Sequence, residues 1–118
     1  MIDIVRHRTG SRMSQIVVHN ATAYFAGQIP DTPEASIEAQ TREVLSKIER
    51  LLDEAGTDQS RLIAAQIWLR SMHDFAAFNR IWEEWIESES APVRACVQAE
   101  LANPNWKVEV QVTAGLHP

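Results

Sequence analysis

Two runs near the C-terminal end most constrain how this chain folds, because each alternates apolar and polar residues with the period of a half-buried strand. The first run places one set of side chains on one face, namely Val93, Ala95, Val97, Ala99 and Leu101, and turns Arg94, Cys96, Gln98 and Glu100 to the other. The second run, residues 106–113, sets Val108, Val110 and Val112 against Lys107, Glu109, Gln111 and Thr113. If one layer of helices buries both apolar faces, Arg94 and Glu109 lie on the same side of the sheet.

Arg94 and Glu109 are the residues of these strands best suited to chemistry. A guanidinium binds a planar carboxylate through two parallel hydrogen bonds, and a nearby carboxylate can act as a general base. The same residue types are ordinary on a solvated strand, so a surface without function stays open. Cys96 falls on the predicted face of Arg94, where a cation would lower the thiol pKa. No histidine stands in a matching local motif for nucleophilic cysteine catalysis.

The N-terminal third predicts three strands. Residues 2–8 form the first, and the runs 15–19 and 22–29 form a hairpin around Asn20 and Ala21. Pro30 and Pro33 then end the third strand.

Two amphipathic helices and a strand follow. The first helix begins at the N-cap Ser36, carries Glu38 in its first turn, and stops at Gly56. A strand spans residues 62–69, and the second helix spans residues 74–88. One stripe of the second helix is aromatic and apolar, which is typical of a core-facing surface: Phe75, Phe78, Trp82, Trp85 and Ile86.

The element order β-β-β-α-β-α-β-β predicts a single α+β domain over residues 1–118, with two helices on one face of a sheet. No segment is left to cover the other face, which mixes polar side chains with small and apolar ones. Such a face favours association with further copies of the chain. Sites between subunits would then draw on Arg94 and Glu109.

Composition narrows the classes of function. A formal charge of −5 and a pI near 5.3 argue against nucleic acid as a partner, since a binding footprint is normally basic. One cysteine allows no intramolecular disulfide, no apolar run approaches the roughly 20 residues of a membrane span, and the N-terminus lacks the pattern of a signal peptide. We therefore expect a cytoplasmic protein without a membrane partner.

No cofactor or metal is expected. The four histidines, at positions 7, 19, 73 and 117, are scattered without the spacing of metal ligands. The four glycines form no phosphate-binding loop.

Three stretches together resemble the RidA/YjgF imine deaminases, a family also called endoribonuclease L-PSP. They are Ala-Gly-Gln-Ile-Pro at residues 26–30, Asn79 with the following Trp82, Glu83 and Trp85, and residues 91–97 leading into 107–110. The spacing from Arg94 to Glu109 fits the family without a gap. The order of elements fits from end to end.

The resemblance implies a chorismate-mutase-like fold and a homotrimer whose sheets pack into a central barrel, with ligand sites between subunits. Family members hydrolyse reactive 2-imino or enamine acids to 2-oxo acids and ammonia. By the resemblance, Arg94 holds the substrate carboxylate, and Glu109 positions and activates water with help from backbone groups around Cys96. Met13, Ala26 and Asn79 complete the substrate-binding residues that the resemblance implies.

Two departures reduce the polar character of the implied pocket. Met13 stands where imine deaminases of the best-known subgroup carry tyrosine, and Ala26 stands where they carry serine. The loss of both hydroxyls favours a larger or more apolar imino acid. Three functions stay open: an imine deaminase, a non-catalytic trimer that binds a small carboxylate metabolite, and an RNA-cleaving or chaperone-like protein.

Overall fold

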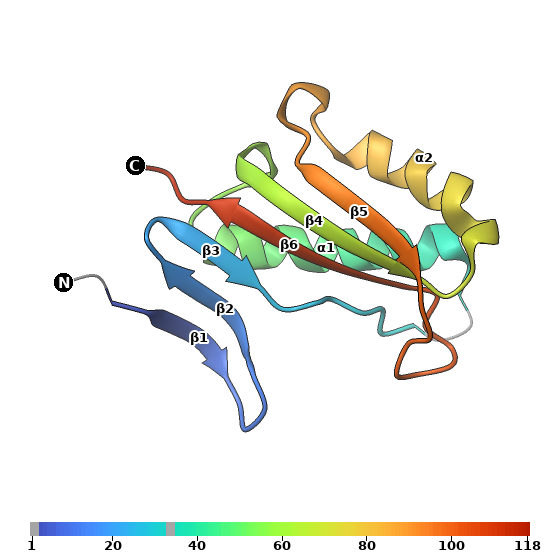
Figure 1. Cartoon of the computed structure of the whole chain (residues 1–118), viewed down its shortest axis with the longest axis horizontal. Helices are drawn as coiled ribbons and strands as arrows, with labels where there is room; N and C mark the ends of the chain where they lie inside the picture. The colour runs from blue at the N-terminus through green and yellow to red at the C-terminus, as the bar shows by residue number, and fades with distance from the viewer. Residues whose placement is uncertain (1–2, 33–34) are drawn as a thin grey trace.

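A computed structural model describes residues 3–32 and 35–118 and contains one six-stranded sheet with two helices on one face (Figure 1). In chain order the elements are β1 (Val5–Thr9), β2 (Ser14–His19), β3 (Thr22–Phe25), α1 (Ile37–Glu54), β4 (Leu62–Leu69), α2 (Phe75–Trp85), β5 (Val93–Gln98) and β6 (Val108–Gly115). Three short 3₁₀ turns interrupt the connections: η1 (Gln59–Arg61), η2 (Met72–Asp74) and η3 (Ser88–Ser90). The α+β class and the element order predicted from the sequence are confirmed.

The sheet has the strand order β1-β2-β3-β6-β4-β5. β4 and β5 are parallel and joined by α2, whereas all other neighbouring pairs are antiparallel. β5 therefore lies at one edge of the sheet and β1 at the other (Figure 1).

The predicted hairpin is present, but its second strand is short. Asn20 and Ala21 have φ values of 55° and 60°, the left-handed pair that a two-residue hairpin turn requires. β3 ends at Phe25 rather than at residue 29, and beyond it Gln28 pairs with Val110 as an isolated bridge. Residue 2 of the predicted first strand and the proposed strand-ending Pro33 lie outside the described residues.

Local capping fixes the first helix. The Ser36 hydroxyl accepts a hydrogen bond from the Ala39 amide at 3.1 Å, which confirms the predicted N-cap. Gly56, with φ of +82°, follows the C-terminal turn in a conformation that glycine adopts without strain. α2 is shorter than predicted, because Ile86 leaves the helix with extended backbone.

The core lies between the helices and one face of the sheet. Its fully buried side chains come from both layers and include Ile16, Val44, Leu45, Ile48, Ile67, Phe78, Val108 and Val110. The predicted aromatic stripe of α2 is only partly inside: Phe78 and Trp82 are buried, whereas Phe75 is 36% exposed.

The register of β5 shows that the predicted shared face of Arg94 and Glu109 is wrong. Ile67, which is fully buried against the helices, pairs with Cys96 on one side and with Val110 on the other. Paired residues share a face, so Cys96 points toward the helices, and Arg94, two residues earlier, does the same. Glu109 is adjacent to Val110 and therefore points to the opposite, open face.

The apolar residues of β5 consequently lie outside, contrary to the sequence-based expectation. Val93 is 73% exposed and Val97 is 46% exposed, and both are on the open face. The physical reason is the aromatic surface of α2, on which the aliphatic stem and the cation of Arg94 can pack at the edge of the sheet. β5 also ends at Gln98, so Ala99 and Leu101 do not extend it.

Candidate functional site

The structure separates the candidate residues into two groups. The Glu109 cluster (Met13, Ala26, Gly27 and Glu109) lies at the open face, where β2, β3 and β6 meet. The Arg94 cluster (Arg94, Cys96, Phe78 and Trp82) lies on the helix face at the β5 edge.

A pocket of about 330 Å³ forms beside the Glu109 cluster on the open face. Met13, Ala26 and Gly27 contribute to its wall. The complete lining is Met13, Ser14, Val17, Tyr24, Phe25, Ala26, Gly27 and Gln111. Gln111 and the hydroxyls of Ser14 and Tyr24 are its polar side-chain groups, whereas Met13, Val17 and Ala26 offer a ligand apolar contacts.

Glu109 sits against the backbone of Gly27. A Cβ added at Gly27 would lie 3.2 Å from Cδ of Glu109 and would collide with its Oε2. Burial raises the pKa of the Glu109 carboxyl above its ordinary value. Within residues 3–32 and 35–118, no ion pair engages this carboxylate, which leaves its oxygens able to accept a proton.

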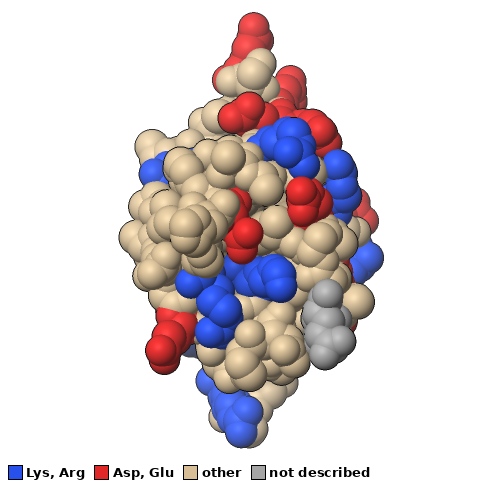
Figure 2. Space-filling model, turned by 90° about the vertical axis from the view of Figure 1, so that its right-hand side faces the viewer, with Lys and Arg blue, Asp and Glu red and all other residues tan. Residues whose placement is uncertain are grey.

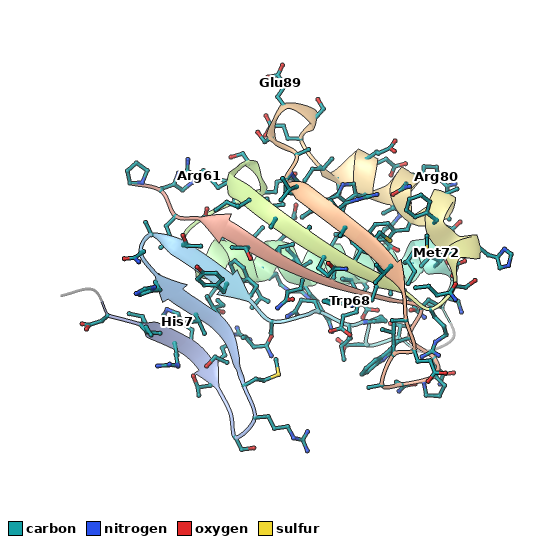
Figure 3. The ribbon with its side chains drawn as sticks, in the orientation of Figure 1. His7, Arg61, Trp68, Met72, Arg80 and Glu89 are labelled. Atoms are coloured by element: carbon teal, nitrogen blue, oxygen red, sulfur yellow. The ribbon has the colours of Figure 1, made fainter. Side chains whose placement is uncertain are left out.

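The segment after β3 is fixed by bonds to β6 and α1. The Gln28 amide donates to the Val110 carbonyl at 2.8 Å, and the Val110 amide donates back to the Gln28 carbonyl at 3.1 Å. Lys47 Nζ donates to the Ile29 carbonyl at 2.7 Å. These bonds hold Gly27 beside the strand that carries Glu109. Trp68, labelled in Figure 3, pairs with Glu109 across β4 and β6 and so shares its open face.

Arg94 packs over two aromatic rings of α2. Its guanidinium carbon lies 6.0 Å from the centroid of Phe78 and 5.6 Å from that of Trp82, which is the geometry of cation–π contacts. The residue is nevertheless exposed, and no ion pair in the described part of the chain occupies its guanidinium. The N–H groups of the Arg94 guanidinium therefore remain available to bind the carboxylate of a ligand.

Cys96 behaves differently from the sequence-based expectation. It shares a face with Arg94, as predicted, although this is the helix face rather than the open one. Burial raises its thiol pKa and outweighs the opposite effect of the Arg94 charge. A neutral, half-buried thiol is a poor nucleophile. Asn79 lies on α2 outside the pocket at Gly27, and its buried Oδ1 has no hydrogen-bond partner among the described residues.

The two clusters are far apart within one chain. Glu109 pairs with Trp68, which pairs with Val97, three residues beyond Arg94 along β5. Two strand spacings and three residues correspond to about 10 Å across the sheet and about 10 Å along it. Because the side chains also point to opposite faces, a small ligand held by Arg94 cannot contact Glu109 of the same chain.

The contact between Gly27 and Glu109, and the position of Tyr24 in the pocket wall, were not predicted from the sequence. Gly27 was visible as part of the Ala-Gly-Gln-Ile-Pro stretch, yet only the fold brings it to Glu109. The structure also contains, within its described ranges, no group of three His, Cys, Asp or Glu side chains placed to hold a metal ion.

Acidic and basic side chains are interspersed over the middle of the face seen in Figure 2. Arg80 pairs with Glu38 at 3.2 Å and Arg42 with Glu84 at 3.1 Å, so these cations are matched by carboxylates. No helix in the described part of the chain has the length and apolar character to cross a bilayer.

Comparison with known proteins identifies the family to which this chain belongs. The profile of the Endoribonuclease L-PSP family matches residues 5–116, which is nearly the whole chain. This chain belongs to that family.

Relatives within the L-PSP family match over almost their entire length. A RutC family protein of Haemophilus ducreyi is 42% identical over 114 residues, covering 97% of each chain. The RutC family protein YoaB of Escherichia coli is 39% identical over 113 residues, covering 96% of this chain and 98% of its own. Among solved structures, NMB1025 of Neisseria meningitidis, a member of the YjgF protein family, superposes with a TM-score of 0.93 at 38% identity, covering 98% of this chain and 97% of its own.

Proposed function

We propose that this L-PSP family member is a cytoplasmic imine deaminase that hydrolyses 2-imino or enamine acids to 2-oxo acids and ammonia. The proposal includes a homotrimer in which the Glu109 cluster of one copy meets the Arg94 cluster of the next. The observation that carries it is the division of the candidate residues: a base on the open face and a carboxylate-binding fork on the other, neither engaged by an ion pair among the described residues.

The open face supports assembly with further copies. Val93, Val97 and Tyr24 are large apolar side chains that this face leaves between 46% and 73% exposed. Association would remove them from water and would cover the pocket next to Ala26 and Gly27. A threefold arrangement is the one that the family resemblance implies.

The reaction needs orientation and a placed water. A protonated imine is already electrophilic, so Arg94 holds its carboxylate while Glu109 accepts a proton from the attacking water. The new C–O bond gives a carbinolamine. Glu109 then returns the proton to nitrogen. As the C–N bond breaks, the Glu109 carboxylate takes the proton of the carbinolamine hydroxyl, so that the C=O of the 2-oxo acid forms and ammonia leaves. The raised pKa of Glu109 suits both steps, because the carboxyl must first accept and then donate.

Met13 and Ala26 favour an alternative in which the trimer binds a small carboxylate metabolite without turning it over. Both side chains line the pocket and neither supplies the hydroxyl that the best-known deaminase subgroup carries there. The carboxylate clamp of Arg94 would serve either function. Turnover distinguishes the two.

The test couples a pyridoxal-phosphate dehydratase or an amino-acid oxidase to the purified protein. Imine decay is followed against capture by semicarbazide, over a panel of small and bulky side chains. Accelerated decay supports the deaminase, with bulky apolar imino acids expected among the better substrates. No acceleration across the panel, together with calorimetric binding of a 2-oxo acid, assigns the binder instead.

Assembly is measured separately by light scattering after size-exclusion chromatography. Three copies of the 13.3 kDa chain give about 40 kDa. A mass of one chain at micromolar concentration would remove the shared site and with it the proposed mechanism.

A further inference from the structure

The loop between β5 and β6, residues 99–107, is tied to the rest of the protein by two side chains from elsewhere. Arg70 follows the last residue of β4, and Gln40 lies in the first turns of α1. Neither belongs to the Glu109 cluster or the Arg94 cluster. Both end on the segment that leads directly into Glu109.

The Arg70 side chain binds the loop at three points. Its guanidinium donates to the carbonyls of Trp106 at 2.8 Å, Leu101 at 3.1 Å and Asn103 at 2.8 Å. Its own backbone amide donates to the Lys107 carbonyl at 3.0 Å. A planar fork with several fixed N–H groups is suited to joining three carbonyls at once, which a lysine ammonium on a flexible stem is not.

Gln40 fixes the same loop from the helix side. It is fully buried, its side-chain amide donates to the Asn105 carbonyl at 3.0 Å, and its side-chain carbonyl accepts from the Lys107 amide at 2.8 Å. Because burying polar atoms without partners is costly, this geometry strongly favours one loop conformation. The peptide group that joins Trp106 to Lys107 is therefore held at its carbonyl by the Arg70 side chain and at its N–H by the Gln40 side chain. The Arg70 backbone amide adds a bond to the Lys107 carbonyl, which a substitution at Arg70 leaves in place.

We propose that Arg70 and Gln40 are positioning residues that fix where β6 begins and thereby place the Glu109 carboxylate against Gly27. Glu109 is two residues beyond the doubly held Lys107, so a shift of Lys107 along the strand moves Glu109 with it. The contact at Gly27 leaves little tolerance, since the carboxylate already touches the glycine backbone region. This role rests on the proposed function, in which Glu109 is the base.

Arg70→Lys is the principal test, and Arg61→Lys is its matched control. Among the described residues, the Arg61 guanidinium donates to one carbonyl, that of Leu116 at 2.8 Å, near the other end of β4 and away from loop 99–107. In Arg70→Lys, kcat for an imino acid should fall roughly 10–100-fold, as misplacing a catalytic group by about 1 Å does. KM should change less than about threefold, because Arg94 still binds the carboxylate.

A second measurement does not depend on turnover. Carbon-13 NMR titration of the Glu109 side chain should show its pKa moving back toward the ordinary value in Arg70→Lys, since a displaced carboxyl is better solvated. Amide exchange at Lys107 should become about tenfold faster. Gln40→Met, which keeps the size but loses the acceptor for the Lys107 amide, should repeat both changes.

These outcomes separate the positioning role from the proposed function. If wild type hydrolyses no imino acid, the deaminase proposal fails and the Glu109 titration still decides whether Arg70 places this carboxylate. An unchanged titration and unchanged exchange in both variants would overturn the inference. So would faster exchange at Lys107 with unaltered kcat, because Arg70 and Gln40 would then hold the loop without positioning the base.

Discussion

Replacing Gly27 with alanine tests the central contact of the Glu109 cluster. The added methyl would lie 3.2 Å from Cδ of Glu109 and would overlap Oε2, so one of the two groups must move. Gly27 is fixed through the paired bonds of its neighbour Gln28 to Val110, whereas the carboxylate is a side-chain terminus. The carboxylate is therefore the group that yields.

The size of the effect follows from that displacement. Restoring ordinary contact requires the carboxylate to move by about 1 Å, which costs on the order of 10²-fold in rate for a group that must meet a water and a bound imine. At 1.36 kcal/mol per factor of ten, this is about 2.7 kcal/mol in the activation free energy. Folding stability should not fall in parallel: Gly56 is the glycine with positive φ in the described ranges, so Gly27→Ala introduces no left-handed backbone strain.

The assay is imine decay with semicarbazide competition, and thermal unfolding is measured on the same preparations. We expect a large loss in kcat, little change in the affinity for a 2-oxo acid, and a melting temperature at or near that of wild type. Gly10→Ala is the control, since a Cβ there would meet only the Met13 carbonyl at 3.9 Å. Equal turnover by Gly27→Ala and wild type would refute the assignment of Glu109 as a base whose placement matters.

Three further outcomes are expected. Arg94→Ala should weaken binding of a 2-oxo acid by about 2–5 kcal/mol in calorimetry, and the absence of its cation–π interactions should lower the free energy of unfolding by at most about 1 kcal/mol; wild-type affinity would contradict the clamp. Turnover should decline as the pH falls through the raised pKa of Glu109, because only the deprotonated form accepts a proton. Glu109→Gln should reduce kcat roughly 10²–10⁴-fold and remove this acidic decline from the pH–rate profile. Met13→Tyr combined with Ala26→Ser should raise kcat/KM for small imino acids more than for bulky ones, and the opposite ranking would exclude the role given to the lost hydroxyls.

Much of the fold can be predicted from the sequence, because short-range patterns determine where its helices and turns begin and end. Ser36 caps a helix, Gly56 ends it, and Asn20 with Ala21 turns a hairpin, each through backbone geometry that depends on a few neighbouring residues. The uncovered sheet face follows from the presence of only two helices in the predicted order of elements. These features need no knowledge of distant contacts.

The orientation of β5 is a different case. Its alternation is genuine, but alternation shows only that two faces differ, not which face meets the helices. Here Arg94 is inward because Phe78 and Trp82 accept its stem and charge, while Val93 and Val97 remain outside on an apolar open face. The sequence of residues 93–98 does not by itself indicate that Arg94 packs on the aromatic surface of α2. The same dependence on distant contacts hides the meeting of Gly27 with Glu109.

The placement of Arg94 and Glu109 on opposite faces has a genetic consequence. In the proposed ring, a subunit lacking Arg94 keeps a sound Glu109 cluster, and a subunit lacking Glu109 keeps a sound Arg94 cluster. Every trimer that contains both kinds of subunit has one junction where an intact Glu109 cluster meets an intact Arg94 cluster. Random mixing of equal amounts makes about three quarters of the trimers mixed, so about a quarter of all sites are restored. Two inactive alleles would thus complement each other in one cell, and activity would be a property of the junction between chains.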